Sequence, residues 1–180
     1  MKKATSGNKG YRLRSGLHIY PEHERIIERM LGELTVSLPA RLVLLTDVAG
    51  QVVTVKGESG SLNLPALGSL VAGDLAASQE IARLTGEYQD YQIVLREGQT
   101  SHTLITEVGD NLAILAQVSH DVALGWARML IRQTANKLAL ELERVDYIDE
   151  ADSFQLDFSD EGEGDLSDLF SDALEDLWQE

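Results

Sequence analysis

The stretch that decides the fold is Leu67-Gly-Ser-Leu-Val-Ala-Gly-Asp-Leu-Ala-Ala-Ser-Gln-Glu-Ile-Ala-Arg-Leu84. Its apolar residues recur at the spacing of one face of a helix. We predict a helix over about 66–85 that closes at Gly86, because glycine readily adopts the left-handed conformation that ends helices. On a helical wheel, one side gathers the apolar residues that are expected to cover a sheet: Leu67, Leu70, Val71, Leu75, Ile81 and Ala82.

The opposite side of this predicted helix is small and nearly uncharged, whereas a merely solvated helix face is usually rich in Lys and Glu. A glycine inside a helix costs about 1 kcal/mol relative to alanine, so Gly73 indicates that another backbone comes close. Two interpretations are open: a tight helix–helix contact inside the fold, or a surface that docks a protein or a second copy of the chain. The residues of this side are Ser69, Ala72, Gly73 and Ala76.

Two polar residues, Asp74 and Ser78, fall within the apolar stripe of the same helix. A buried carboxylate needs hydrogen-bond donors. A cap or loop amide near a dimer axis is the expected donor for Asp74.

The flanking sequence predicts two more helices and five strands. Pro21 opens a helix over about 22–35, and a last helix is expected over about 122–144. Two apolar β-branched runs joined at Gly50 predict a hairpin, and three later runs with short turns predict an antiparallel meander. The predicted order is α-β-β-α-β-β-β-α, an α+β sandwich with one five-stranded antiparallel sheet and helices on its faces. The strands are expected at 41–47, 51–56, 91–96, 100–108 and 111–118.

Three segments resemble roadblock/LC7 domains and, among them, the bacterial mutual-gliding protein B group of GTPase regulators. They are the helix over 67–84, the hairpin Leu42-Val-Leu-Leu-Thr-Asp-Val-Ala-Gly50 and the strand Asp110-Asn-Leu-Ala-Ile-Leu-Ala116. The resemblance covers about residues 22–144. It rests on pattern and element order, because no single catalytic motif defines the family.

The resemblance implies a homodimer whose sheets join edge to edge through the third strand, at about 91–97, with Ile93 and Leu95 in the contact region. It also implies that the paired second helices form the platform on which a small Ras-like GTPase docks. By position, this platform includes Ser69, Ala72, Gly73 and Ala76. The implied function is that of a non-enzymatic adaptor, acting as a GTPase-activating protein or as a co-regulator.

The charge of the chain is concentrated at its two ends. The net charge is −15, yet residues 1–14 carry five Lys and Arg with no acid, and residues 146–180 carry fourteen Asp and Glu with no base. We expect a flexible basic lead at 1–20, the roadblock/LC7 domain at 21–145 and an acidic disordered tail at 146–180. Nucleic-acid binding needs a basic face that neutralises phosphates, so a nucleic-acid partner is not expected.

Within the acidic tail, residues 165–178 combine an apolar face with an acidic one. A purely solubilising tail does not need exposed Phe and Trp, so one interpretation is a helix that folds when it docks on a partner. A helix that packs back on its own domain and a solubilising tail are the alternatives. The residues at helical spacing are Leu166, Leu169, Phe170, Leu174, Leu177 and Trp178.

The sequence contains no recognisable catalytic or cofactor motif. It lacks the G-x-x-x-x-G-K-[ST] phosphate loop, and its four histidines have no metal-ligand spacing. The absence of cysteine excludes disulfides, and the apolar runs are too short for a membrane span. We therefore expect a cytoplasmic protein with no enzyme activity, metal or cofactor. Two other functions remain open: a ligand sensor of PAS or GAF type, which needs an aromatic-lined pocket, and a light chain that only dimerises cargo.

Overall fold

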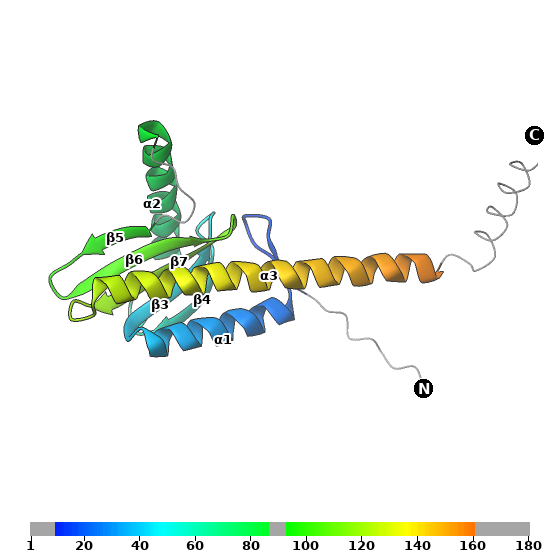
Figure 1. Cartoon of the computed structure of the whole chain (residues 1–180), viewed down its shortest axis with the longest axis horizontal. Helices are drawn as coiled ribbons and strands as arrows, with labels where there is room; N and C mark the ends of the chain where they lie inside the picture. Colours follow the sequence, from blue (N-terminus) through cyan, green and yellow to red (C-terminus); the bar gives the residue numbers. More distant parts are fainter. Residues whose placement is uncertain (1–9, 87–92, 161–180) are drawn as a thin grey trace, which may run out of the picture. The chain divides into compact units, whose positions relative to one another are not determined.

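A five-stranded antiparallel sheet forms the centre of the fold (Figure 1). The computed structural model describes residues 10–86 and 93–160, with side chains described as far as Val145. The strand order is β4-β3-β7-β6-β5, and each neighbouring pair is antiparallel. The strands are β3 (Ala40–Asp47), β4 (Val52–Gly57), β5 (Ile93–Glu97), β6 (Ser101–Val108) and β7 (Leu112–Ser119).

Helices cover both faces of this sheet. α1 (Pro21–Ser37) and α3 (Leu124–Asp160) pack on one face, and α2 (Leu64–Thr85) packs on the other. Successive residues of a strand point to opposite faces, so Val43 of β3 joins the core beneath α1 and α3, whereas Leu44 joins the core beneath α2. The predicted α+β class, the five-stranded antiparallel sheet and the order α-β-β-α-β-β-β-α are confirmed.

The boundaries of α2 follow from its end residues. The Asn63 side chain accepts a hydrogen bond from the Ala66 amide at 3.2 Å, and Pro65 lies in the first turn, where its missing amide proton leaves no helical bond unmade. At the other end Gly86 has φ = 73°, the left-handed conformation that was predicted for it.

A short hairpin precedes these elements. β1 (Tyr11–Arg12) pairs with β2 (His18–Ile19), and Leu13 and Ile19 are buried in the core beneath α1 and α3. The flexible lead predicted over 1–20 is therefore wrong for residues 11–19. The glycines and basic residues of this segment suggested a flexible chain. Burial of the two apolar side chains in the core stabilises the hairpin against the entropy cost of ordering it.

The last helix is longer than predicted. α3 ends at Asp160 rather than at about 144, so residues 146–160 are helical where a disordered tail was predicted. The chain divides into two compact units, 1–142 and 143–180. The sheet, α1, α2 and α3 as far as Leu142 belong to the first unit. Over the residues that the structure describes, no helix has the length and apolar character needed to cross a membrane.

Candidate docking surface on the second helix

α2 buries only a narrow arc of its circumference. Gly68, Val71, Leu75 and Ala82 are buried, and Val71 and Leu75 belong to the core between α2 and the sheet. The rest of the helix surface divides into two flanks with different chemistry. We call them the small flank (Ser69, Ala72 and Ala76, bordered by Gly73) and the apolar flank (Leu70, Ala77, Ile81 and Leu84).

The small flank is open to solvent. Ser69, Gly73 and Ala76 are exposed, and Ala72 is half-buried. A Cβ atom added to Gly73 would meet nothing within 4 Å. No other backbone of the described chain approaches Gly73, so a tight helix–helix contact inside the fold does not explain this glycine.

The apolar flank corrects the predicted wheel. Leu70 and Ile81 were expected to cover the sheet, yet they are 70% and 62% exposed, and Leu84 is 70% exposed. The reason lies at Gly68, where an added Cβ would stand 2.5 Å from the carbonyl oxygen of Gly50. Because the helix backbone lies directly against this turn, the side of α2 that carries Gly68 faces inward and Leu70 is turned outward.

The apolar flank lies on the side of α2 that is tied to the edge strand β5. Arg96 of β5 donates a hydrogen bond from Nη2 to Oδ1 of Asp74 at 2.7 Å, and the Asp74 side chain is only 17% exposed. The donor for Asp74 is therefore a neighbouring guanidinium rather than the cap or loop amide that was predicted. This charge-assisted hydrogen bond orients the Arg96 and Asp74 side chains.

Among the described residues β6 is the one strand that pairs with β5, so within this part of the chain one edge of the sheet is open beside the apolar flank. Ile93 and Leu95 are half-buried and pack against the core beneath α1 and α3. Their side chains thus belong to the face of the sheet. At the edge of the sheet, the backbone N–H and C=O groups of β5 can pair with a neighbouring strand.

The small flank begins at the turn between β3 and β4, which a buried carboxylate holds in place. Asp47 accepts hydrogen bonds from the Gln51 amide at 2.6 Å and from the Ser15 amide at 2.8 Å. Gly50 follows with φ = 84°, and a Cβ added there would stand 2.7 Å from Cα of Ser69. Sequence reasoning missed Asp47, although an Asp at the start of a turn is a recognised signal for side chain to backbone bonding.

A hollow of about 510 Å³ adjoins the far end of the small flank and is lined by Ala76, Gln79, Glu80 and Arg83. Arg83 donates hydrogen bonds to both carboxylate oxygens of Glu80, at 2.8 and 2.6 Å. This bonding lowers the pKa of Glu80 and raises that of Arg83. Gln79 is hydrogen-bonded to Glu107 of β6, which ties this part of α2 to the sheet.

Among the described residues that line hollows beside α2, beside the N-terminal hairpin and between α1 and α3, the one aromatic side chain is that of Tyr11. The aromatic-lined pocket that a ligand sensor requires is not among them. Within residues 10–86 and 93–145, whose side chains are described, no three His, Asp or Glu side chains form a group that could hold a metal ion.

Part of the predicted site lies outside the described residues. This applies to the beginning of the third predicted strand at 91–92 and to the whole predicted docking helix 165–178. The residues of that helix are Leu166, Leu169, Phe170, Leu174, Leu177 and Trp178.

Solved structures of MglB proteins and of a roadblock/LC7 domain superpose on this chain. MglB of Myxococcus xanthus is 28% identical and superposes with a TM-score of 0.61, over 66% of this chain and 95% of that one. The gliding protein MglB of Thermus thermophilus is 26% identical with a TM-score of 0.59, over 69% of this chain and 93% of that one. No family model and no curated protein sequence matches the chain.

A more distant structure shares the fold alone. The roadblock/LC7 domain from Streptomyces avermitilis is 13% identical, with a TM-score of 0.57 over 64% of this chain and 96% of that one. The chain therefore has the roadblock/LC7 fold, and its similarity to MglB extends to sequence as well as structure.

Proposed function

We propose that the chain is a non-enzymatic homodimeric adaptor that binds and regulates a small Ras-like GTPase. The observation that carries the proposal is the exposed, uncharged small flank of α2 within a fold similar to MglB. GTPase regulation is what resemblance to the MglB group implies. A helix surface of Ser, Ala and Gly lets a partner backbone come close without displacing long side chains.

The apolar flank and the open edge of β5 support the dimer. In a two-fold dimer the same patch of each copy contacts its counterpart. Antiparallel pairing of the two β5 strands would supply hydrogen-bond partners to both open edges. Leu70, Ile81 and Leu84 lie on the same side of α2 as the Asp74–Arg96 pair, so the second α2 would cover them. One similar solved structure is described as MglB with a tetrameric arrangement.

The division of α2 into two flanks leaves the small flank free when the apolar flank is occupied. Two small flanks, one from each copy, would then form a platform for the GTPase. The mechanism is positional: the platform contacts the switch region and biases it toward one geometry, since binding energy that differs between two states shifts their populations. The chain acts as a GTPase-activating protein or as a co-regulator and supplies no reacting group from the small flank, whose largest side chain is that of Ser69.

Two adjacent alanines allow a sharp test. Ala76 lies on the small flank and Ala77 on the apolar flank, and both are exposed. We expect full-length Ala76→Arg protein to remain a folded dimer and to lose the GTPase in affinity capture from native lysate. We expect Ala77→Arg protein to remain folded and to dissociate into monomers at a higher protein concentration than the unchanged protein. Circular dichroism and analytical ultracentrifugation check the fold and the dimer.

Capture is performed with GTP and then with GDP supplied. A recovered GTPase whose amount depends on the nucleotide supports the regulator, and purified protein then shows whether hydrolysis is accelerated. Normal capture by Ala76→Arg protein would refute the role of the small flank. Equal recovery of a non-GTPase cargo under both nucleotides would favour the dimerising light chain instead.

A further inference from the structure

A second exposed apolar surface lies on α3, far in sequence from the α2 flanks. Trp126, Met129 and Leu140 are 49%, 39% and 62% exposed. They share one face of the helix with Gln133 and Lys137, because the five positions are separated by three or four residues. We call this set the outer α3 surface. The opposite side of the same helix is buried in the core through Ala127, Ile131, Ala135 and Leu138.

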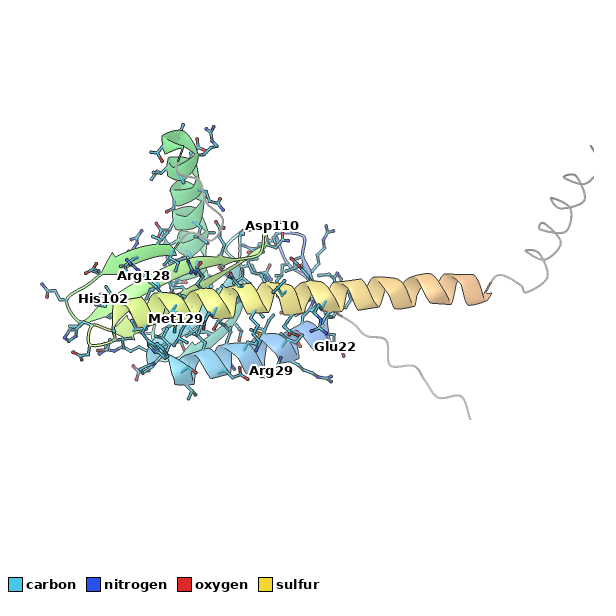
Figure 2. All side chains as sticks on the ribbon, viewed as in Figure 1. Glu22, Arg29, His102, Asp110, Arg128 and Met129 are labelled. Atoms are coloured by element: carbon cyan, nitrogen blue, oxygen red, sulfur yellow. The ribbon has the colours of Figure 1, made fainter. Side chains whose placement is uncertain are left out.

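The outer α3 surface is bordered by positive charge. Residues 122–140 contain Arg128, Arg132 and Lys137 and no Asp or Glu. The ion pairs of the described residues involve none of these three bases. Figure 2 marks Arg128 beside Met129 on this helix. Glu33 of α1 lines a hollow of about 170 Å³ together with Lys137.

The acidic end of the chain has the complementary chemistry. Residues 161–180 contain acids and no base, and the apolar residues of 165–178 recur at helical spacing. A helix with one apolar face and one acidic face matches a surface with an apolar stripe and a basic border, because both the apolar and the charged parts find partners.

We propose that the outer α3 surface binds residues 165–178 of a second copy of the chain, and so links dimers into larger assemblies. Chain length favours a second copy over the same copy. Only residues 161–164 separate the end of α3 at Asp160 from the segment, and four residues span about 14 Å at most. The helix between Leu140 and Asp160 is about 30 Å long at 1.5 Å per residue. The inference does not depend on the GTPase.

Docking of this kind is weak and sensitive to salt. The apolar stripe is short, and ordering the segment offsets much of what burial of Leu169, Phe170 and Trp178 contributes. The remaining stabilisation comes from charges at the border, which are screened over a Debye length of about 8 Å at 0.15 M salt. Assembly would therefore respond to protein concentration and ionic strength.

The first test is a binding titration. A fluorescently labelled peptide of residues 161–180 is added to the full-length chain carrying Leu169→Asp and Phe170→Asp, which inactivate its own segment. We expect saturable binding that falls at least about tenfold when Arg128→Glu and Arg132→Glu are added. The matched control, Arg25→Glu with Arg41→Glu, changes the net charge equally at exposed positions off the outer α3 surface, and we expect less than about a twofold change.

Equal weakening by the two charge reversals would overturn the proposal, because it would show only general repulsion. Loss of binding in Ala76→Arg protein with no effect of the α3 reversals would place the docking site on α2 and would overturn it too. Absence of saturable binding would do the same.

The second test is sedimentation of the otherwise unchanged full-length chain. We expect species larger than the dimer at rising concentration, lost with Leu169→Asp and Phe170→Asp and reduced by added salt. Association that persists in that variant, or a single species at all concentrations, would contradict linkage through a second copy.

Discussion

The two flanks of α2 are neighbouring, exposed surfaces of one helix, and they differ in the size of their side chains. The apolar flank carries Leu70, Ile81 and Leu84, each more than 60% exposed. The small flank carries no side chain larger than serine at its centre. Covering large exposed apolar side chains stabilises an association. Small side chains permit close approach of a partner but contribute little apolar area to the contact. From this difference we propose permanent association at the apolar flank and reversible, geometry-dependent contact at the small flank.

The largest expected effect comes from charging the apolar flank. We expect the double variant Ile81→Asp, Leu84→Asp to be monomeric at concentrations where the unchanged protein is dimeric. Each side chain contributes about 1.5–3 kcal/mol when buried, so the dissociation constant should rise by about two orders of magnitude or more. Analytical ultracentrifugation measures it.

The matched control for that variant places the same charges on the small flank. Ser69→Asp with Ala76→Asp should leave the dissociation constant of the dimer nearly unchanged while removing GTPase binding. Equal loss of the dimer in both double variants would show that the two flanks form one continuous interface, and the distinction drawn above would be wrong.

Two glycines of α2 have different surroundings. A Cβ at Gly68 would stand 2.5 Å from the Gly50 carbonyl oxygen, whereas a Cβ at Gly73 would meet nothing within 4 Å. We expect Gly68→Ala to lower the free energy of unfolding by about 1–3 kcal/mol through overpacking. Gly73→Ala should raise it by up to about 1 kcal/mol, because alanine is the better helix former. Urea denaturation measures both changes.

The same pair tests the small flank. If a partner backbone comes close at Gly73, then Gly73→Ala weakens GTPase binding although it stabilises the fold. Unchanged binding by the stabilised Gly73→Ala protein would mean that no partner approaches there, and the glycine would be without a role in docking.

The edge of the sheet provides a smaller effect. Arg96→Ala leaves the mostly buried Asp74 carboxylate without its partner, which we expect to cost about 1 kcal/mol of unfolding free energy because Arg96 is itself largely exposed. It should also weaken the dimer, since Asp74 holds the β5 edge against the side of α2 that bears the apolar flank. Glu97→Ala, at an exposed position of the same strand, serves as the control. Equal effects of both variants on dimerisation would contradict a specific role for Arg96.

Sequence periodicity was sufficient for the elements and their order, because each strand and helix has its own strong apolar pattern and clear end residues. It failed for the rotation of α2. A helical wheel is oriented by its large apolar residues. It does not reveal that Gly68 faces the core, where another backbone lies against it. The predicted inward placement of Leu70 and Ile81 was wrong for that reason.

The prediction of a flexible N-terminal lead was wrong for a related reason. Leu13 and Ile19 are two apolar residues in a polar segment, and they anchor it because they pack into the core beneath α1 and α3. Ser69, Gly73 and Ala76 are exposed and Ala72 is half-buried. That they dock a partner stays a prediction, based on the contrast between their small size and the chemistry of a solvated helix. Asp47 went unnoticed because its two backbone donors come from a neighbouring turn and from the N-terminal hairpin, whose formation was not predicted.

The smallest effect concerns the face of the sheet away from both flanks. Glu28 of α1 accepts hydrogen bonds from Lys56 and, at 2.9 Å, from Thr54 of β4. Bonding to Lys56 and then to Thr54 lowers the pKa of Glu28 below its ordinary value. The folded protein therefore prefers the ionised carboxylate, and this preference contributes stability above the unfolded pKa. The contribution disappears as the pH falls through the lower, folded pKa.

Because the Glu28 side chain is 52% exposed, solvent screening limits its contribution to about 0.5 kcal/mol. We expect Glu28→Gln to lower the free energy of unfolding by this amount at pH 7 and by less as the solution is acidified below pH about 4. Glu33→Gln, an exposed position on the same helix, should show no such difference. Dimerisation and GTPase binding should be unaffected by Glu28→Gln, because α1 and β4 meet on the side of the sheet opposite α2. A change in either would mean that the α2 flanks respond to packing across the sheet, and that their difference is not set locally by Gly68 and the turn at Gly50.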